Sequence, residues 1–416
     1  MNGEVASMNG EVARSSGLSR LLEPHTAEEF LASTWGQTYK HIRGRAGKFA
    51  HLLPWERLSD ILRQHRLDFP RLRLMREGRA LPVNSYLRHT ASARHKQTIP
   101  HVQPVKFTGQ LRAGATLVLD AVDELHEPLE ELAADLEHLF CERIQINSYA
   151  GWHTSRGFDL HWDDHDVFIL QVAGRKHWRI YGETRPHPLA GERDNPKPVV
   201  DTPPLWAETL EDGDFLYIPR GWWHVAEPLE EPTLHLTVGI HKQTGIDLLS
   251  WLARRMRASE TFRRDLPRFA SADERAAHAR RLREEFVAAW DDESLERYFA
   301  ELDAEAEPRP RLSLPWSATA DALPPTAHAR VRLLAPRPLS FKVADGVVEF
   351  SCHKKRWRFA AEALPLLQLL ADRRNCSVAE LRTVAAAAAG EQLDEQTVRA
   401  FVRELLRHGL LAVVAD

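Results

Sequence analysis

Apolar and polar residues alternate in short runs over much of the chain up to about residue 240, and glycine, proline and charged residues separate these runs. A period of two places apolar side chains on one face of an extended chain, which predicts β-strands. Helical spacing occurs in 26–31, 55–65 and 123–140, and the stretch 76–115 is predicted to be irregular and polar. The predicted strands are 71–75, 116–122, 143–150, 167–172, 177–181, 215–219 and 234–240.

Short strands preceded by a few helices predict a double-stranded β-helix, the jelly-roll barrel, over residues 21–243. The pattern changes at 244, because 244–307 lacks strand signals and carries apolar stripes at helical period. Residues 308–416 begin with a proline-rich linker and continue with strands and then helices, with Ser377 and Asp394 as expected N-caps. We therefore expect a mainly β plus α chain: a barrel, a helical segment and a winged-helix-like C-terminal domain.

Composition narrows the class of protein. Of 416 residues, 43% are hydrophobic and 27% charged, which is typical of a globular protein, and no apolar run reaches the length of a membrane span. The formal net charge of -4 argues against nucleic-acid binding by bulk electrostatics. Three scattered cysteines fit a reducing cytoplasm. The hexapeptide MNGEVA occurs at 1–6 and again at 8–13, so residues 1–20 are expected to be disordered or an artefact of the expressed sequence.

The candidate chemistry lies in the stretch HWDDHD. His161 and Asp163 are two residues apart, so on a strand both side chains would leave the same face. His224, which follows the strand-like run FLYIP, could supply a third ligand. Two histidines and one carboxylate on one side of a metal form the facial triad of non-heme iron(II) oxygenases. The H-x-D pattern alone is weak evidence, and a solvated turn is its default interpretation.

A hairpin with Gly174 at its bend follows the motif. Lys176 shares a face of the second strand with Trp178 and Ile180, which is unusual for a lysine if that face is buried. A buried ammonium group needs an anionic partner, and none is adjacent in sequence. The alternative is a lysine at the rim whose charged end extends into solvent.

These motifs resemble those of JmjC-type 2-oxoglutarate oxygenases, in particular the bacterial branch of the ribosomal oxygenase (cupin-like) family. The resemblance rests on H-x-D at His161, on the basic residue fifteen positions later, on an asparagine fourteen positions before the motif, and on PRGWWH and LHLTVGI. It implies iron(II) bound by His161, Asp163 and His224, and 2-oxoglutarate as cosubstrate. The residues that it assigns to the cosubstrate are Lys176, Asn147, Tyr149 and Thr237. It also implies a homodimer formed through 244–307.

The resemblance implies hydroxylation of a side chain in a protein or peptide, with a ribosomal protein favoured and a natural-product precursor peptide as an alternative. Two other classes remain: a non-catalytic JmjC and winged-helix binding module, and a small-molecule cupin oxygenase. Neither a membrane nor a nucleic acid is an expected partner. His165 is predicted to face substrate or support the ligands, Trp222 and Trp223 to pack the barrel end, and the basic run 353–358 to be solvated strand charge.

Overall fold

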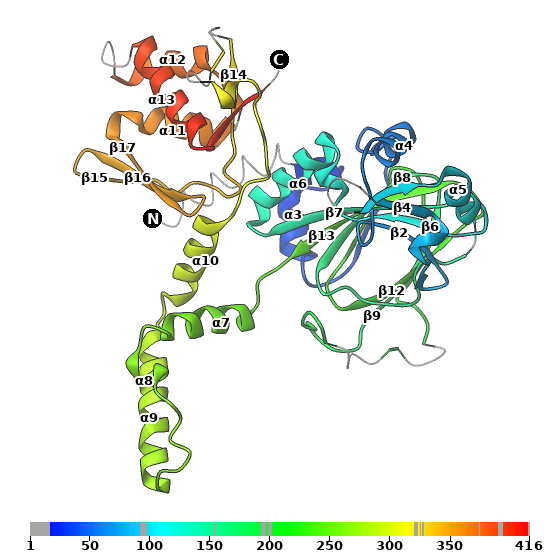
Figure 1. The fold of residues 1–416 in the computed structure, drawn as a ribbon, viewed down its shortest axis with the longest axis horizontal. Coiled ribbons are helices and arrows are strands. Elements are labelled where there is room, and N and C mark those ends of the chain that lie inside the picture. Colours follow the sequence, from blue (N-terminus) through cyan, green and yellow to red (C-terminus); the bar gives the residue numbers. More distant parts are fainter. Residues whose placement is uncertain are drawn as a thin grey trace. The chain divides into compact units, whose positions relative to one another are not determined.

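The computed structural model describes residues 17–91, 98–153, 155–192, 197–198, 202–319, 323–324, 326, 328–373, 375–389 and 394–414 (Figure 1). The chain divides into two compact units, with the boundary between Lys242 and Gln243. Helix α2 (Gly17–Leu22) begins before the predicted start of order at Leu21, and residues 1–16, which include both copies of the hexapeptide, lie outside the described residues.

The first unit is built from antiparallel strands. They are β1 Lys40–Ile42, β2 Leu72–Arg76, β3 Arg79–Ala80, β4 Leu87–Ala91, β5 Thr98–Val102, β6 Thr116–Leu119, β7 Arg143–Gly151, β8 Asp166–Ala173, β9 Lys176–Glu183, β10 Trp206–Leu210, β11 Phe215–Ile218, β12 Trp222–Pro228 and β13 Thr233–His241. An eight-stranded sheet has the order β1-β11-β8-β13-β7-β6-β2-β3, and a three-stranded sheet has the order β10-β9-β12. Strands β4 and β5 form a separate hairpin.

Helices precede or interrupt these strands: α2, α3 Ala27–Ser33, α4 Trp55–Gln64, α5 Pro104–Arg112 and α6 Glu127–Phe140. The predicted capping box is present at the start of α3, where Thr26 Oγ1 accepts a hydrogen bond from Glu29 N at 3.1 Å. The segment 76–115 was predicted to be irregular, and this is wrong, because it contains β3, β4, β5 and α5. Strands β4 and β5 expose residues of both parities, so they lack the alternation that marks a half-buried strand.

The two faces of the large sheet pack against different partners. On β8, Phe168 and Leu170 join the main core with residues of α2, α3 and α6, such as Leu18 and Phe30. The alternate residue Ile169 joins a second core with residues of β9 and β10 from the small sheet. Two antiparallel sheets therefore enclose an apolar interior, as expected for a jelly-roll barrel.

The second unit begins with helices α7 Gly245–Met256, α8 Glu260–Arg263, α9 Ala272–Ala289 and α10 Ser294–Glu305. A small core of Leu248, Trp251, Leu252 and Tyr298 joins α7 to α10. The remainder contains β14 Arg330–Leu333, β15 Lys342–Ala344, β16 Val347–Cys352, β17 Lys355–Ala360, α11 Leu364–Arg373, β18 Asn375–Ser377, α12 Val378–Ala389, α13 Glu395–Arg407 and β19 Leu411–Val414. Within the described residues, no helix is both long enough and apolar enough to cross a lipid bilayer.

The carboxylate of Asp166 joins three parts of the barrel at the start of β8. It is fully buried and accepts hydrogen bonds from Tyr217 Oη at 2.7 Å, from Arg220 N at 2.9 Å and from Lys242 Nζ at 2.7 Å. A buried carboxylate is tolerated because these donors replace water. Asp166 therefore ties β8, the loop before β12 and the end of β13 together.

Asp166→Asn should lower the free energy of unfolding by about 3 kcal/mol, because the amide removes the charge opposite Lys242 and turns an NH₂ group toward other donors. Asp60→Asn is the matched control, since Asp60 forms an exposed ion pair with Arg63 whose loss should cost less than about 1 kcal/mol. Urea unfolding measures both. Equal losses in the two variants would contradict the role of Asp166.

Candidate active site

His161 and His224 are far apart in sequence, but backbone hydrogen bonds pair them directly. His161 N donates to His224 O at 3.1 Å, and His224 N donates to His161 O at 2.8 Å. Gly221 N donates to Asp163 O at 2.9 Å, which holds the same loop against the start of β12. Gly221 has φ of 84°, and a Cβ on it would lie 2.4 Å from Pro188 Cδ, so the close approach requires glycine.

The spacing of the H-x-D pair suggested that both residues lie on a regular strand, and they do not. His161 forms an isolated bridge with His224, and β8 begins only at Asp166. The intervening backbone is irregular because Asp163 O is bonded to Gly221 N instead of joining a strand ladder. Alternation along a strand therefore does not explain how the two side chains converge.

The three side chains nevertheless converge. One ligand atom from each of His161, Asp163 and His224 lies within 4.8 Å of the others, and His224 Nε2 is 3.5 Å from Asp163 Oδ2. His161 Nδ1 is 2.8 Å from Asp159 O, and His224 Nδ1 is 2.9 Å from Trp222 O. A carbonyl oxygen can only accept, so each Nδ1 carries the hydrogen and each Nε2 keeps its lone pair for a metal.

The protonation states also suit a cation. Burial, together with the neighbouring His161, lowers the pKa of His224 to about 4, so its imidazole is neutral at neutral pH. Burial alone would raise the pKa of the Asp163 carboxyl, but the surrounding histidines outweigh it and hold that pKa below its usual value. Two imidazoles and one carboxylate are the donors of a facial-triad metal centre, so these residues fit a divalent iron ion.

Lys176 is buried at the start of β9, where only 7% of its surface is exposed. Its side chain shares the inward face with Trp178 and Ile180, as the alternation predicted, and Nζ lies 5.8 Å from the centre of the Trp178 ring. Among the described residues, no carboxylate forms an ion pair with it, and burial lowers the pKa of Lys176 to about 7. The alternative of a solvated rim lysine is wrong.

A cluster of rings connects Lys176 with the triad. His235 is stacked on Tyr149 with ring centres 5.0 Å apart, and Trp178 meets His235 edge-on at 5.5 Å. Trp178 also stacks on His224 at 6.1 Å. His235 Nδ1 and Trp178 Nε1 are buried without a hydrogen-bond partner in the described structure. This interior therefore has a cation and two unused polar atoms, which fits an anionic ligand bearing several oxygen atoms.

The remaining predicted cosubstrate residues line up in the large sheet. Thr237 pairs with Asn147, and His235 pairs with Tyr149, so all four lie on the face that Ile169 also occupies. Asn147 Oδ1 is already used, because it accepts hydrogen bonds from Ala121 N at 2.9 Å and from Gln145 Nε2 at 3.0 Å. Asn147 thus has a structural role in addition to the predicted one.

Two inward histidines were missed from the sequence. His235 and His241 have the same parity as Thr237 on β13, and extending the alternation by two residues toward the N-terminus and by four toward the C-terminus would have found them. His165 lies next to Asp164 and His241 and is not one of the three residues of the triad.

Other predicted positions have ordinary packing roles. Trp223 is buried, and its Nε1 donates to Thr184 Oγ1 at 2.8 Å, while Trp222 packs near Tyr39. In the basic run 353–358, Trp357 is buried and Arg358 pairs with Glu349 at 2.7 Å. Lys354 pairs with Glu307. These contacts agree with solvated strand charges.

Comparison with known proteins identifies the fold. The JmjC domain model matches residues 124–248. The bifunctional lysine-specific demethylase and histidyl-hydroxylase NO66 of Drosophila pseudoobscura pseudoobscura is 26% identical over 254 residues, which cover 58% of this chain and 24% of that protein. Ribosomal oxygenase 1 of Gallus gallus is 27% identical over 228 residues, which cover 54% of this chain and 36% of that protein. The chain thus spans only a minor part of these relatives' lengths.

Among solved structures, the ribosomal oxygenase YcfD of Escherichia coli in complex with cobalt and 2-oxoglutarate matches with a TM-score of 0.55 and 19% identity, covering 94% of this chain and 99% of that one. At this identity the match establishes the fold, and it confirms the predicted JmjC and cupin-like fold class. Residues 124–248 therefore match the JmjC domain, and the chain is similar in sequence to the ribosomal oxygenases over about half of its length.

Proposed function

We propose that this chain is an iron(II)- and 2-oxoglutarate-dependent oxygenase that hydroxylates a side chain of a protein or peptide. The observation that carries the proposal is the buried ammonium group of Lys176, which has no carboxylate partner among the described residues and shares the barrel interior with the triad. A buried cation of this kind is costly unless an anion accompanies it. A dicarboxylate that also reaches the metal would meet that need.

His161, Asp163 and His224 would hold the metal, with each histidine ring fixed by its Nδ1 hydrogen bond to a backbone carbonyl. Lys176 would bind the distal carboxylate of 2-oxoglutarate, and Tyr149, Asn147 and Thr237 would orient it. When bound, iron(II) and 2-oxoglutarate would let dioxygen place one oxygen atom on a substrate carbon, while 2-oxoglutarate takes up the other and is oxidised to succinate and carbon dioxide. Burial of Lys176 beside the Trp178 ring keeps water away from it, which strengthens its attraction for a carboxylate.

The relatives support a protein substrate. The matched proteins are named as ribosomal oxygenases or histidyl-hydroxylases, and the histidyl-hydroxylase NO66 is also named as a lysine-specific demethylase. We propose hydroxylation of a ribosomal protein, with a precursor peptide as the second candidate. Intact-mass analysis of ribosomal proteins and candidate peptides, after incubation with the enzyme, iron(II), 2-oxoglutarate and oxygen, should reveal one species that has gained one oxygen atom. If no ribosomal protein and no candidate peptide gains an oxygen atom, the proposal of a protein or peptide substrate is contradicted.

The two rival classes make different demands on the site. A non-catalytic binding module has no need of a complete triad or a buried lysine, and this chain has both. A small-molecule cupin oxygenase has no evident use for Lys176. These features favour a 2-oxoglutarate-dependent oxygenase, and the names of the relatives favour a macromolecular substrate.

The division of the chain beyond the JmjC domain remains a proposal. We propose residues 21–243 as the catalytic domain, 244–307 as a helical dimerisation segment and 308–416 as a linker with a winged-helix-like domain. The described part of 308–416 contains two three-stranded sheets and helices α11, α12 and α13. Asp394 caps α13 as predicted, since its Oδ1 accepts a hydrogen bond from Thr397 N at 2.8 Å. The cytoplasm is the proposed location.

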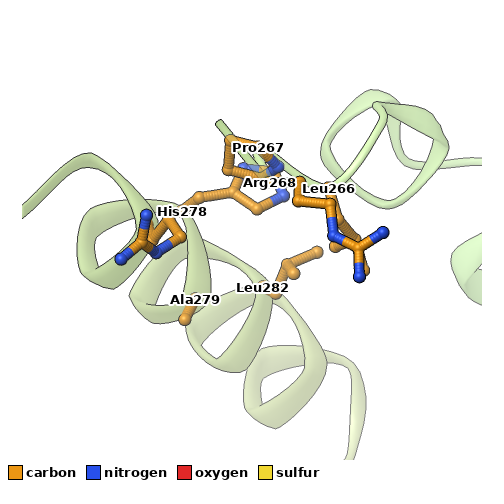
Figure 2. A pocket seen from close by; sticks show the side chains of 7 residues that line it. Leu266, Pro267, Arg268, His278, Ala279 and Leu282 are labelled. Atoms are coloured by element: carbon orange, nitrogen blue, oxygen red, sulfur yellow. The ribbon is translucent and has the colours of Figure 1, made fainter. Parts of the chain in front are cut away.

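The helical segment supports self-association because it exposes large apolar side chains. Leu266 is 74% exposed and Phe269 is 99% exposed, and Leu295 and Phe299 are also exposed on α10. Beside Leu266, a pocket is lined by residues 266–268 and by side chains of α9 (Figure 2). Apolar surface of this extent is typical of an interface, and we propose a second copy of the chain as its partner.

The triad should be essential for turnover. His161→Ala and Asp163→Ala should each abolish the conversion of 2-oxoglutarate to succinate, because two ligands hold a divalent ion poorly, while the melting temperature changes little. The exposed His51 provides the control, and His51→Ala should keep wild-type turnover. Turnover that survives both triad substitutions would show that the metal assignment is wrong.

Lys176→Ala should weaken 2-oxoglutarate binding by a factor of roughly one hundred to several thousand, since breaking a buried charge pair costs about 3–5 kcal/mol. Lys176→Arg should be milder because it keeps the charge. Isothermal titration with metal-loaded protein measures the affinity. Metal affinity should stay unchanged, and the exposed Lys106→Ala should behave as wild type.

The same titration gives a pH dependence. The free Lys176 has a pKa of about 7, and a bound carboxylate raises it. Affinity should therefore be fully present below pH 7 and fall by up to roughly tenfold per pH unit above it, because binding must then take up a proton. Lys176→Arg should lose this dependence. A flat wild-type profile, or equal affinities in all variants, would contradict the role of Lys176.

Self-association should depend on the exposed apolar side chains of the helical segment. Light scattering should show a dimer for the wild type. The paired changes Leu266→Glu with Phe269→Glu, or Leu295→Glu with Phe299→Glu, should convert it to a monomer, because a buried carboxylate at the interface is strongly unfavourable. Val105→Glu, at an exposed apolar residue of α5 in the first unit, should leave the dimer intact. A monomeric wild type, or dimers in both paired variants, would rule out this interface.

A further inference from the structure

A second cluster of metal-binding side chains follows the triad directly in sequence. Asp164, His165 and His241 each offer a ligand atom, and these atoms lie within 4.8 Å of one another. Asp164 and His165 immediately precede β8, and His241 is the last residue of β13. None of the three belongs to the triad, so the two clusters share no ligand.

The contacts within this cluster orient its two imidazole rings. Asp164 Oδ1 lies 2.9 Å from His165 Nδ1. An ionised carboxylate only accepts, so His165 Nδ1 carries the hydrogen, and in the neutral ring His165 Nε2 presents its lone pair. This is the carboxylate–histidine arrangement that commonly supports a metal ligand. The rings of His165 and His241 lie 4.4 Å apart, centre to centre.

Gly239 provides independent evidence that the two rings meet over one point. A Cβ on Gly239 would lie 2.8 Å from His165 Nε2 and 3.6 Å from His241 Nε2. Both Nε2 atoms therefore lie close to the position that a side chain on Gly239 would occupy. Any larger residue at 239 would press on the His165 ring, whose Cδ2 would be only 2.7 Å from the new Cβ.

We propose that Asp164, His165 and His241 form a second metal site, which takes a divalent cation of the zinc class. Two imidazole nitrogens with a carboxylate are typical ligands of zinc and neighbouring first-row metals. The side chains of Asp164 and His165 are 38% and 20% exposed, so an ion can enter and keep water as a further ligand. This inference does not depend on the proposed oxygenase activity.

The surrounding charges favour a cation at this place. Asp163 and Asp166 flank the cluster in sequence, and Asp166 is already paired with Lys242. Arg143 is opposite His241 in the β7–β13 register and its charge opposes a cation there, but its side chain is exposed and therefore screened by solvent. The carboxylate of Asp164 contacts the His165 ring directly, and we expect it either to bind the ion or to hold His165 in place.

The test measures bound zinc in the full-length protein after removal of metal, by equilibrium dialysis and elemental analysis. The double variant His161→Ala with Asp163→Ala disables the triad and should still bind one equivalent of zinc. Adding His165→Ala or His241→Ala to that background should remove this equivalent, and adding His51→Ala should not. In the wild-type background, Asp164→Asn should weaken zinc binding at the second site by roughly 10- to 100-fold.

Gly239→Ala tests the geometry without removing a ligand. In an otherwise wild-type protein, Gly239→Ala should abolish zinc binding at the second site. The triad should still bind one equivalent of zinc, which also shows that the barrel is folded. The proposal is overturned if the triad-disabled variant binds no zinc, or if its zinc survives both His165→Ala and His241→Ala. If the triad itself proves not to bind metal, the test of the second site still stands, because the decisive comparison is made in the triad-disabled background.

Discussion

The pair of backbone hydrogen bonds between His161 and His224 is the constraint on which the rest of the site depends. It joins the loop before β8 to β12, and so joins the large sheet to the small one at the metal end of the barrel. Because the backbone makes this link, both histidine side chains remain free for a ligand. Asp166 secures the same loop from the other side through Tyr217 and Lys242.

The interior between the sheets combines two electrostatic features that are costly separately. Lys176 is a buried cation without an ion-pair partner among the described residues, and the triad gathers two imidazoles around a carboxylate. A ligand with one carboxylate at Lys176 and further oxygen atoms at a metal would relieve both costs. His235 and Trp178 lie between them and have unused polar atoms, so the whole interior is arranged for one extended anionic ligand.

Much of this could be read from the sequence because the barrel strands alternate with a period of two. That period correctly placed Lys176 with Trp178 and Ile180 on a buried face. The H-x-D spacing, the position of His224 and the family resemblance suggested the triad, whose three side chains lie together in the structure. The period of two failed where the backbone leaves the strand ladder. The loop at 161–165 converges through contacts with Gly221 and His224, which are distant in sequence. The hairpin β4–β5 was missed because its strands are exposed on both faces.

Calorimetric titration of 2-oxoglutarate into the full-length protein, with and without a divalent metal such as manganese(II), tests most directly whether the triad and Lys176 act as one site. The account predicts tight binding of one equivalent when metal is present and much weaker binding in its absence, because only the Lys176 end of the ligand is then held. Equal binding in the two conditions, or no binding in either, would contradict it.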